Sequence, residues 1–481
     1  MKARIFAEEN KKWWTLAAVA FGLFMIMLDN TVVNVALPSI ERDLHISISE
    51  LEWIVTAYAL VFASVLITGG KLADLFGRRR IFVVGLVIFT ASSLACGLAA
   101  SAGFLIGARA VQGVGAALMS PATLSIITAT FPPRQRGMAI GIWAGVSALA
   151  LAIGPLAGGL IVDNINWNWI FFINVPVGIA GIVASQIFIK ESRDTSHEQS
   201  VDVPGLVTSG LSLFVLTYAL IEGNRRGWAS PEIVGLFAAA AVLMAAFVLV
   251  EHRQRLPMLD LSLFRNSSFT GANIVALLVS LGMFGVFFYV SLYVQNVLGY
   301  TPTQAGAMFL PMTVLIILVA PFAGRASDRV GSRWLMGGGM MLLGISLLFY
   351  QRAGVHSNFW TLLPAMILGG VGMASTMSPM TSAAMGAVPV DKAGVGSGVL
   401  NSFRQVGGAL GIAAMGAILA SYLHTAPRSP EGRQQYVDGM HAALAVSAGI
   451  VFAGAIVAVL LVHVKPQTER AHIREMEAGA A

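Results

Sequence analysis

The segment 70–79 reads GKLADLFGRR, and the segment 324–333 reads GRASDRVGSR. Gly70, Asp74 and Gly77 recur in the second segment, and basic side chains fill matching positions at an offset of 254 residues. A second match follows in the same order, since GVG and MSP, which begin at positions 113 and 119, return at positions 370 and 377. Two ordered matches indicate that the chain contains two related halves.

The composition places the chain in a membrane. Of its 481 residues, 56% are hydrophobic and 11% are charged, whereas a soluble domain carries about 25% charged residues. Mean hydropathy is +0.77. The basic residues are spread over short loops between apolar runs rather than gathered in one segment, which argues against a nucleic-acid partner. The single cysteine, Cys96, lies in an apolar run and excludes an intrachain disulfide.

Fourteen apolar segments are long enough to cross the bilayer core, which needs about 20 helical residues. The first is interpreted as a retained helix, because it is longer than the roughly 7–15 apolar residues of a signal peptide and contains Asp29. The expected spans are 15–37, 51–70, 81–101, 104–127, 138–161, 169–189, 204–222, 232–251, 269–296, 304–324, 334–351, 361–385, 394–419 and 442–464.

The basic residues also orient the chain. With the amino terminus inside the cell, 22 of the 30 Lys and Arg residues fall in internal segments, 6 in external loops and 2 within spans. This asymmetry follows the positive-inside rule. We therefore expect a multi-pass protein of the cell (inner) membrane with both termini cytoplasmic.

The offset between the halves predicts the architecture. At roughly 30 residues per helix and loop, a six-helix repeat would give an offset near 190, so 254 corresponds to eight helices. We predict an all-α polytopic membrane protein with two six-helix bundles, residues 1–199 and 263–481, the second including a cytoplasmic tail. An inserted transmembrane hairpin with its linkers occupies 200–262.

These segments resemble signatures of the major facilitator superfamily. The loop at 70–80 is similar to the signature between the second and third helices, and LDNTVVNVALP at 28–38 to the first-helix signature of drug:H⁺ antiporters. RAVQGVG at 109–115 resembles the fourth-helix motif, and GPLAGG at 154–159 the fifth-helix antiporter motif. With fourteen spans, the whole chain resembles the drug:H⁺ antiporter-2 family and implies the major facilitator fold.

The chain departs from the family pattern at two positions. Ala150 replaces a further glycine of the antiporter motif, which is one small residue for another. The sixth helix of such proteins begins Gly-Trp-Arg-Trp, whereas this chain reads NWNW at 166–169. The role of the missing arginine at the outer end of that helix is therefore left open.

Asp29 is predicted to bind a proton or the substrate. It is the only acidic residue that the sequence places well inside a span, since Glu222 and Glu251 fall at helix ends. A carboxylate within the membrane costs about 2.5 kcal/mol or more, which marks the position as functional. The alternative is a structural hydrogen bond to a neighbouring helix. At helical spacing, one face of this span carries Gly22, Met25, Asp29, Val33 and Ala36. We expect this face to line a cavity.

Two arginines lie within spans and are expected to tune the protonation of Asp29. The fourth-helix resemblance associates Arg109 with proton coupling, although its position near a helix end would also allow it to snorkel outward. Arg404 lies deeper, so we expect it to face the central cavity or else to pack on carbonyls of an adjacent helix.

The repeated loop predicts a latch. An aspartate at the mouth of the protein can accept hydrogen bonds from arginines or from the amino end of a neighbouring helix. Plain positive-inside anchoring is the alternative. The gating residues would be Gly70, Asp74, Gly77, Arg78 and Arg79, with Asp328 as a weaker counterpart.

Small residues and a proline mark the antiporter motif. Its members are Gly154, Pro155, Gly158 and Gly159. Glycines allow helices to approach closely, and the resemblance implies that this packing seals the cavity against a leak. Cavity-lining candidates, whose aromatic members could instead pack in the core or face lipid, are Asn30, Asn34, Tyr58, Gln112, Trp143, Tyr289, Tyr293 and Asn401.

Together these features predict a proton-coupled antiporter that exports small hydrophobic, drug-like compounds by alternating access, and not an enzyme. The expected partners are protons, the substrate and the lipid bilayer. No cofactor, metal, nucleotide or nucleic acid is expected, and the chain is expected to act as a monomer. Alternatives are export of an endogenous amphiphile, such as a lipid, pigment or self-made antibiotic, and nutrient symport. A membrane enzyme or sensor would need a catalytic constellation within the spans or an extramembrane domain.

Overall fold

The computed structural model describes residues 8–193, 202–254, 257, 259, 261–388, 393–425 and 429–463, and no strand occurs among them. Thirteen of the described helical segments are long and apolar enough to cross a membrane. A further long helix, α6 (Pro133–Asn164), occupies the remaining expected span. Helices or helix pairs therefore lie at all fourteen expected positions.

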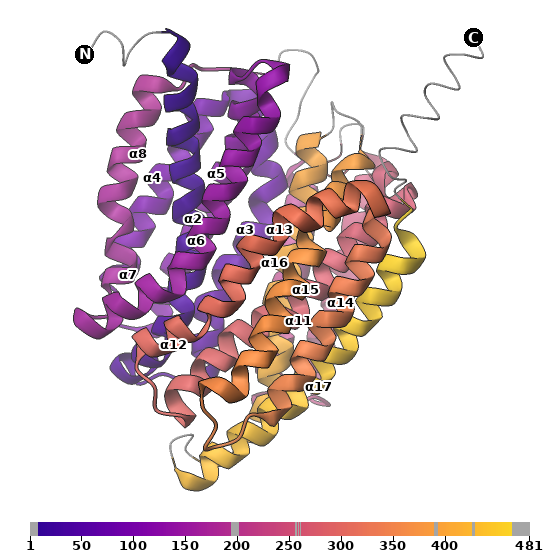
Figure 1. The fold of residues 1–481 in the computed structure, drawn as a ribbon. Coiled ribbons are helices and arrows are strands. Elements are labelled where there is room, and N and C mark those ends of the chain that lie inside the picture. The colour runs from indigo at the N-terminus through magenta and orange to yellow at the C-terminus, as the bar shows by residue number, and fades with distance from the viewer. Residues whose placement is uncertain are drawn as a thin grey trace.

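The chain folds into two six-helix bundles and a hairpin; the two bundles lie side by side in Figure 1. The first bundle contains α2 (Glu8–Leu44), α3 (Ile48–Phe76), α4 (Arg78–Gly97), α5 (Ala102–Thr130), α6, and the pair α7 (Trp169–Phe172) and α8 (Asn174–Phe188). The hairpin contains α9 (Val203–Arg226) and α10 (Pro231–Arg253). The second bundle contains α11 (Ser267–Leu292), the pair α12 (Pro302–Met308) and α13 (Leu310–Val330), α14 (Ser332–Phe349), α15 (Phe359–Gly386), α16 (Ala393–Ala420) and α17 (Pro430–Leu461).

The first and last long helices place both ends of the described chain on one side. Figure 1 shows α2 beginning and α17 ending at the same end of the molecule, which we call the termini end. The opposite end, where α2 ends and α17 begins, is called the far end. An even number of crossings requires this arrangement.

The sequence repeat reappears as repeated packing. In the first bundle, a Cβ added to Gly115 of α5 would lie 2.8 Å from the carbonyl oxygen of Gly85 in α4. In the second, a Cβ added to Gly372 of α15 would lie 2.8 Å from the carbonyl oxygen of Gly339 in α14. Only glycine permits helices to pack this closely, so the same contact is built twice.

The hairpin lies against both bundles through one of its two helices. α9 packs on α3 of the first bundle and α16 of the second, while α10 packs on α9. Trp53 of α3 contacts Phe214 and Tyr218 of α9, with ring centroids 5.7 and 6.0 Å apart. α10 is mostly unburied, and Val242 is 67% exposed. The outer helix is therefore suited to face lipid.

Two helices extend beyond the expected spans. α2 continues through Pro38 to Leu44, and the Arg42 side chain donates to the Pro38 carbonyl. α17 begins at Pro430, with Ser429 capping its first turn. These helix ends are polar or contain proline, so a hydropathy average does not detect them. Proline is nevertheless well tolerated in the first turn of a helix, as at the start of α17.

The domain boundaries stay a prediction. The junction between residues 199 and 200 lies outside the described residues. The junction between 262 and 263 falls within a short 3₁₀ turn, Leu261–Arg265.

Candidate functional site

Asp29 and Arg109 form an ion pair in the interior of the first bundle. Arg109 Nη1 lies 2.5 Å from Asp29 Oδ2, and the two residues are 1% and 0% exposed. Arg109 Nε also donates to the carbonyl of Ile54 at 3.2 Å, and its guanidinium carbon lies 4.3 Å from the ring centroid of Tyr58. In this structure Arg109 therefore points inward to a carboxylate and does not snorkel.

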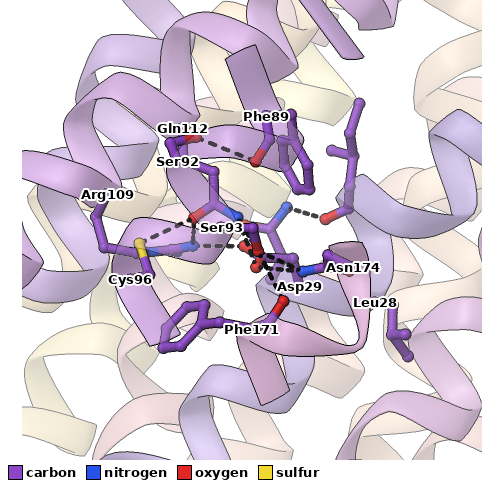
Figure 2. Close-up of polar contacts among 12 residues, drawn as sticks. Leu28, Asp29, Phe89, Ser92, Ser93, Cys96, Arg109, Gln112, Phe171 and Asn174 are labelled. Carbon is purple, nitrogen blue, oxygen red and sulfur yellow. Dashed lines mark hydrogen bonds and ion pairs between the residues drawn. The ribbon is translucent and has the colours of Figure 1, made fainter. Parts of the chain in front are cut away.

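Three amide and hydroxyl side chains complete the network around Asp29 (Figure 2). Gln112 Nε2 and Asn174 Nδ2 donate to Asp29 Oδ1 at 3.0 and 3.3 Å. Asn174 also donates to Ser93 Oγ at 3.0 Å. Gln112 was a sequence candidate, whereas Ser93 and Asn174 were missed. The network joins α2, α5 and α8 through the Asp29 carboxylate, and α4 through the Ser93 hydroxyl.

The ion pair with Arg109 depends on whether Asp29 carries a proton. Removing one member of a buried ion pair leaves an uncompensated charge, which costs about 3–5 kcal/mol. Protonation of Asp29 would leave Arg109 charged and buried without its counter-ion. Protonation of Asp29 would therefore remove the ion pair that joins α5 to α2.

The face of α2 that was expected to line a cavity packs inside the first bundle instead. Gly22, Met25, Asp29, Val33 and Ala36 are all buried. A Cβ on Gly22 would lie 2.7 Å from the ring of Phe82 in α4. Small side chains on this face allow close helix packing, and that packing explains the pattern.

Several aromatic candidates have core positions. Tyr58 lies under the Arg109 guanidinium. Tyr293 donates to the carbonyl of Gly354 within the second bundle at 2.6 Å. Trp143 Nε1 donates to Thr123 Oγ1 at 3.1 Å. These side chains are held by packing and hydrogen bonds in this structure rather than presented to a ligand.

Four polar candidates remain partly accessible: Asn30, Asn34, Asn401 and Arg404. The side-chain amides of Asn30 and Asn34 donate to carbonyls one turn earlier in α2, at 2.9 and 3.1 Å. Arg404 forms no hydrogen bond or ion pair with any residue that the structure describes. This leaves its guanidinium available for another partner.

Glu52, like Glu222 and Glu251, is an acid near a helix end that the structure buries, so Asp29 is not the only buried carboxylate. It is 4% exposed and accepts a 2.8 Å hydrogen bond from the Tyr289 hydroxyl of α11. The sequence places Glu52 at the second residue of the expected span 51–70, where an acidic side chain ordinarily reaches the interface. It is buried because α11 and α16 of the other bundle cover it, which hydropathy cannot register.

Hydrogen bonds join the two bundles at the far end. They include three side chains of the second bundle, one near the end of α11 and two in the π-helical turn Tyr293–Val297 that follows it. Ser291 Oγ donates to the carbonyl of Asn34 at 2.9 Å, Gln295 Nε2 to the carbonyl of Val35 at 3.0 Å, and Asn296 Nδ2 to Glu41 Oε2 at 3.1 Å. The bundles are thus in contact at this end.

The antiporter motif lies at the same junction. Gly154 and Gly158 face α2 within the first bundle. A Cβ on Gly159 would lie 2.5 Å from the carbonyl oxygen of Pro302 in α12, and the backbone of Pro155 also approaches α12. The motif therefore allows α6 to contact helices of both bundles.

The gating loop has the expected turn in both halves. Gly77 and Gly331 have φ angles of 109° and 92°, which a residue with a side chain rarely adopts. Asp74 pairs with Arg78 of the same loop, with Nη2 to Oδ1 at 2.9 Å. A Cβ on Gly70 would make only an ordinary contact with Pro121. Asp328 lies in α13, and its side chain is outside the described part.

Glu191, which the sequence interpretation missed, caps the helix after this loop. Its two carboxylate oxygens each accept a backbone hydrogen bond at 3.1 Å, from Arg79 and Arg80 at the start of α4. An acid suits a helix amino terminus. The available signal was an acidic residue directly after the sixth span, between Lys190 and Arg193.

Lys71 ties the loop to the chain that follows the hairpin. Its ammonium donates to the carbonyl of Pro257. Burial lowers the pKa of Lys71, while the nearby carboxylates of Glu251 and Asp202 oppose that shift. The contact places the end of the hairpin beside the gating loop.

Asn168 stands where the family pattern has arginine. Its Nδ2 donates to the carbonyl of Gly97 at 2.8 Å and so satisfies an unpaired acceptor at the end of α4. Ala150 is fully buried, which agrees with the need for a small residue there.

Comparisons with known proteins identify the family. The sequence profile of the Major Facilitator Superfamily matches residues 19–412 and 272–480. The tetracenomycin C resistance and export protein of Streptomyces glaucescens is 38% identical over 412 residues, which is 86% of this chain and 77% of that protein. The multidrug resistance protein Stp of Mycobacterium tuberculosis (strain CDC 1551 / Oshkosh) is 37% identical over 412 residues, covering 85% and 76%.

A solved structure shares the fold. The bacterial homologue of the human lysosomal transporter Spinster, in an inward-facing and unoccupied conformation, matches with a TM-score of 0.66 and 18% identity. The match covers 94% of this chain and 97% of that one. On the sequence profile and the similarity to these relatives, the chain belongs to the Major Facilitator Superfamily.

Proposed function

We propose that the chain exports small hydrophobic compounds from the cell in exchange for protons, by alternating access. The observation that carries this proposal is the fully buried Asp29–Arg109 pair, connected to four helices of one bundle. The names of the two relatives, which denote export or multidrug resistance, support the substrate class.

The orientation follows from the positive-inside pattern. If the termini end faces the cytoplasm, the hydrogen bonds between Ser291, Gln295 and Asn296 and the first bundle close the external side. The conformation then corresponds to the state that receives substrate from the cytoplasm. Asp74 and the loop around it would stabilise the opposite state.

The proton step uses the Asp29 network. A proton that reaches Asp29 from outside breaks its charge pairing with Arg109, and the guanidinium then depends on Gln112, the Ile54 carbonyl and the Tyr58 ring. Release of the proton to the cytoplasm restores the ion pair. Inward proton flow would in this way supply the free energy for outward substrate movement.

The partly accessible polar residues are the best candidates for contact with substrate. Asn30 and Asn34 belong to the first bundle, and Asn401 and Arg404 belong to the second. Because Arg404 has no acidic partner among the described residues, a substrate with a carbonyl, phenolate or carboxylate group could bind it.

A second candidate function is export of one self-made antibiotic. It is favoured by the name of the Streptomyces glaucescens relative, which gives one compound, tetracenomycin C, for both resistance and export. The two functions differ in substrate range. A dedicated exporter would confer resistance to one chemical class, and a multidrug exporter to several.

The test is expression in a bacterium that lacks its own efflux pumps, followed by a panel of dyes and antibiotics. Inverted membrane vesicles then report transport under an imposed proton gradient. We expect resistance to several hydrophobic compounds and uptake that stops when an ionophore collapses the gradient. Uptake that continues without a proton gradient would contradict the coupling, and absence of resistance or uptake with every compound would contradict export.

A further inference from the structure

Glu52 lies where the two bundles meet, and nothing in the transport step above uses it. It belongs to α3 of the first bundle, yet its carboxylate accepts from Tyr289 of α11 at 2.8 Å. A Cβ on Gly416 of α16 would overlap both the Glu52 carboxylate and the Tyr289 hydroxyl. Tyr436 of α17 donates to the Tyr289 carbonyl at 2.8 Å and fixes that part of α11. Two helices of the second bundle, α11 and α16, therefore contact one acid of the first, and α17 holds α11 beside it.

The hydrogen count at Tyr289 indicates which form of Glu52 fits this site. The Tyr289 oxygen lies 2.8 Å from Glu52 Oε1 and 3.0 Å from the Ile412 carbonyl oxygen. A phenol carries one hydrogen, and both an ionised carboxylate and a carbonyl only accept. If Glu52 is ionised, the single hydroxyl hydrogen of Tyr289 can serve either Glu52 or Ile412, and the other oxygen–oxygen contact has no hydrogen. A protonated Glu52 donates to Tyr289, which donates to Ile412, and both contacts are then satisfied.

The charges around Glu52 also favour its neutral form. None of the described basic groups near it forms an ion pair with it, since Arg109 pairs with Asp29 and Arg226 pairs with Glu222 and Glu232. Glu222 of α9 repels a negative charge on Glu52. The titratable or charged groups on the surrounding helices include Tyr289, Tyr436, Tyr218, Glu222, Arg226, Arg404, Arg109, Asp29 and Glu41.

We propose that Glu52 is a second proton-binding site, which must be protonated for the two bundles to close at the far end. In an open state water can solvate the ionised carboxylate. Closure removes that water, so the carboxylate takes up a proton from the solution at the far end and donates it in a hydrogen bond to Tyr289. The proposed function enters only through the orientation, which makes the far end external.

Infrared difference spectroscopy tests the proton directly. In the purified protein at neutral pH, we expect a carbonyl band from a protonated carboxylic acid that disappears in Glu52→Gln. The matched control is Glu222→Gln, which changes an acid of the adjoining helix α9 in the same way and should retain the band. A band unchanged by Glu52→Gln, or its absence in the unmodified protein held closed, would overturn the proposal.

Distance measurements test the coupling to closure. Spin labels on Asp43→Cys and Ser421→Cys, both exposed at the far end of opposite bundles, report their separation. The native Cys96 is fully buried, and a sample without added cysteines measures its background labelling. We expect the separation to increase as pH rises in the unmodified chain. In Glu52→Gln it should stay short at all pH values, because the amide cannot ionise and still donates to Tyr289.

A second variant guards against misfolding. Tyr289→Phe removes the acceptor for the Glu52 proton, so the closed population at low pH should be smaller than in the unmodified chain. The rest of its infrared spectrum should match that of Glu222→Gln. A separation in Glu52→Gln that follows pH as in the unmodified chain would refute the inference. Neither experiment requires transport, so a chain that exports nothing could still confirm Glu52 as a proton site.

Discussion

Arg109 and Gln112 of the first bundle correspond to Met366 and Gly369 of the second, at the offset of 257 residues set by the repeated GVG segments. Ser93 corresponds to Leu347 at the offset of the repeated loop. The backbones approach in the same way in both bundles, since Gly115 meets Gly85 as Gly372 meets Gly339. The polar side chains of the Asp29 network are absent at these positions of the second bundle.

This difference separates packing from chemistry. Glycine contacts are required in both bundles because both must hold closely packed helices. The ion pair is needed in one place only, so the second bundle fills the equivalent space with Met366 and Leu347, which are fully buried. We infer that the first bundle responds to protons, while the second follows through contacts such as Glu52–Tyr289.

The largest expected effect comes from giving the first bundle the side chain of the second. Arg109→Met leaves Asp29 buried without a counter-ion and should lower the free energy of unfolding by about 3–5 kcal/mol, with loss of proton-driven efflux. The double variant Asp29→Asn/Arg109→Met should regain most of the stability but no transport. Thermal unfolding in detergent and vesicle uptake measure the two effects.

Met366→Leu is the matched control for that experiment. It conserves volume at the equivalent buried position and should cost less than about 1.5 kcal/mol. If it impaired coupling as strongly as Arg109→Met, the division of roles between the bundles would be wrong.

The next effect concerns the junction between the bundles. Gly159→Val inserts a side chain against the Pro302 carbonyl, and such overpacking costs about 1–3 kcal/mol. We expect efflux to fall about 10-fold, with a proton leak into vesicles that carry no substrate, since α6 and α12 can no longer close. Gly145→Val on the same helix is the control, because no atom lies within 4 Å of a Cβ at that position. Equal losses in the two variants would contradict a sealing role for the motif.

A smaller effect compares the two loop turns. Gly77→Ala and Gly331→Ala each place a side chain at positive φ, which costs about 1–2 kcal/mol. The loss should be larger at Gly77, because its Cβ would also lie 2.7 Å from the Glu191 carboxylate. Unfolding midpoints of the two variants test this order, and a larger loss at Gly331 would reverse it.

The smallest effect is expected on the outer helix of the hairpin. A cysteine at Val242 of α10 should react with a thiol reagent at the same rate with and without substrate, because this helix packs on α9 and is mostly unburied. Cysteines along the rest of α10 should behave alike. Substrate protection along a whole face of α10 would place the hairpin in the transport pathway.

The sequence predicted the helices well because each crossing needs about 20 apolar residues, a local property. It also identified Asp29, Arg109 and Gln112 as candidates, since polar groups within the membrane are costly. It could not join them, because Asp29 and Arg109 are 80 residues apart and meet only through tertiary packing. Asn174 and Ser93 were not predicted, for the same reason.

Burial between bundles was the hardest feature to predict. Tyr58 and Tyr289 were proposed to line a cavity, but an aromatic side chain looks alike in a sequence whether it packs or binds. Glu52 was overlooked near the start of its span, where hydropathy treats an acid as interfacial. In both cases the neighbour that decides the role comes from a distant segment.

The most direct test of the central claim is proton release on substrate binding. Purified protein in weakly buffered detergent, with a pH-sensitive dye, is mixed with a compound that it exports. We predict that the unmodified chain releases more protons than Asp29→Asn, which should still bind the compound and remain folded. Equal proton release by the two proteins would contradict the assignment of coupling to the first bundle.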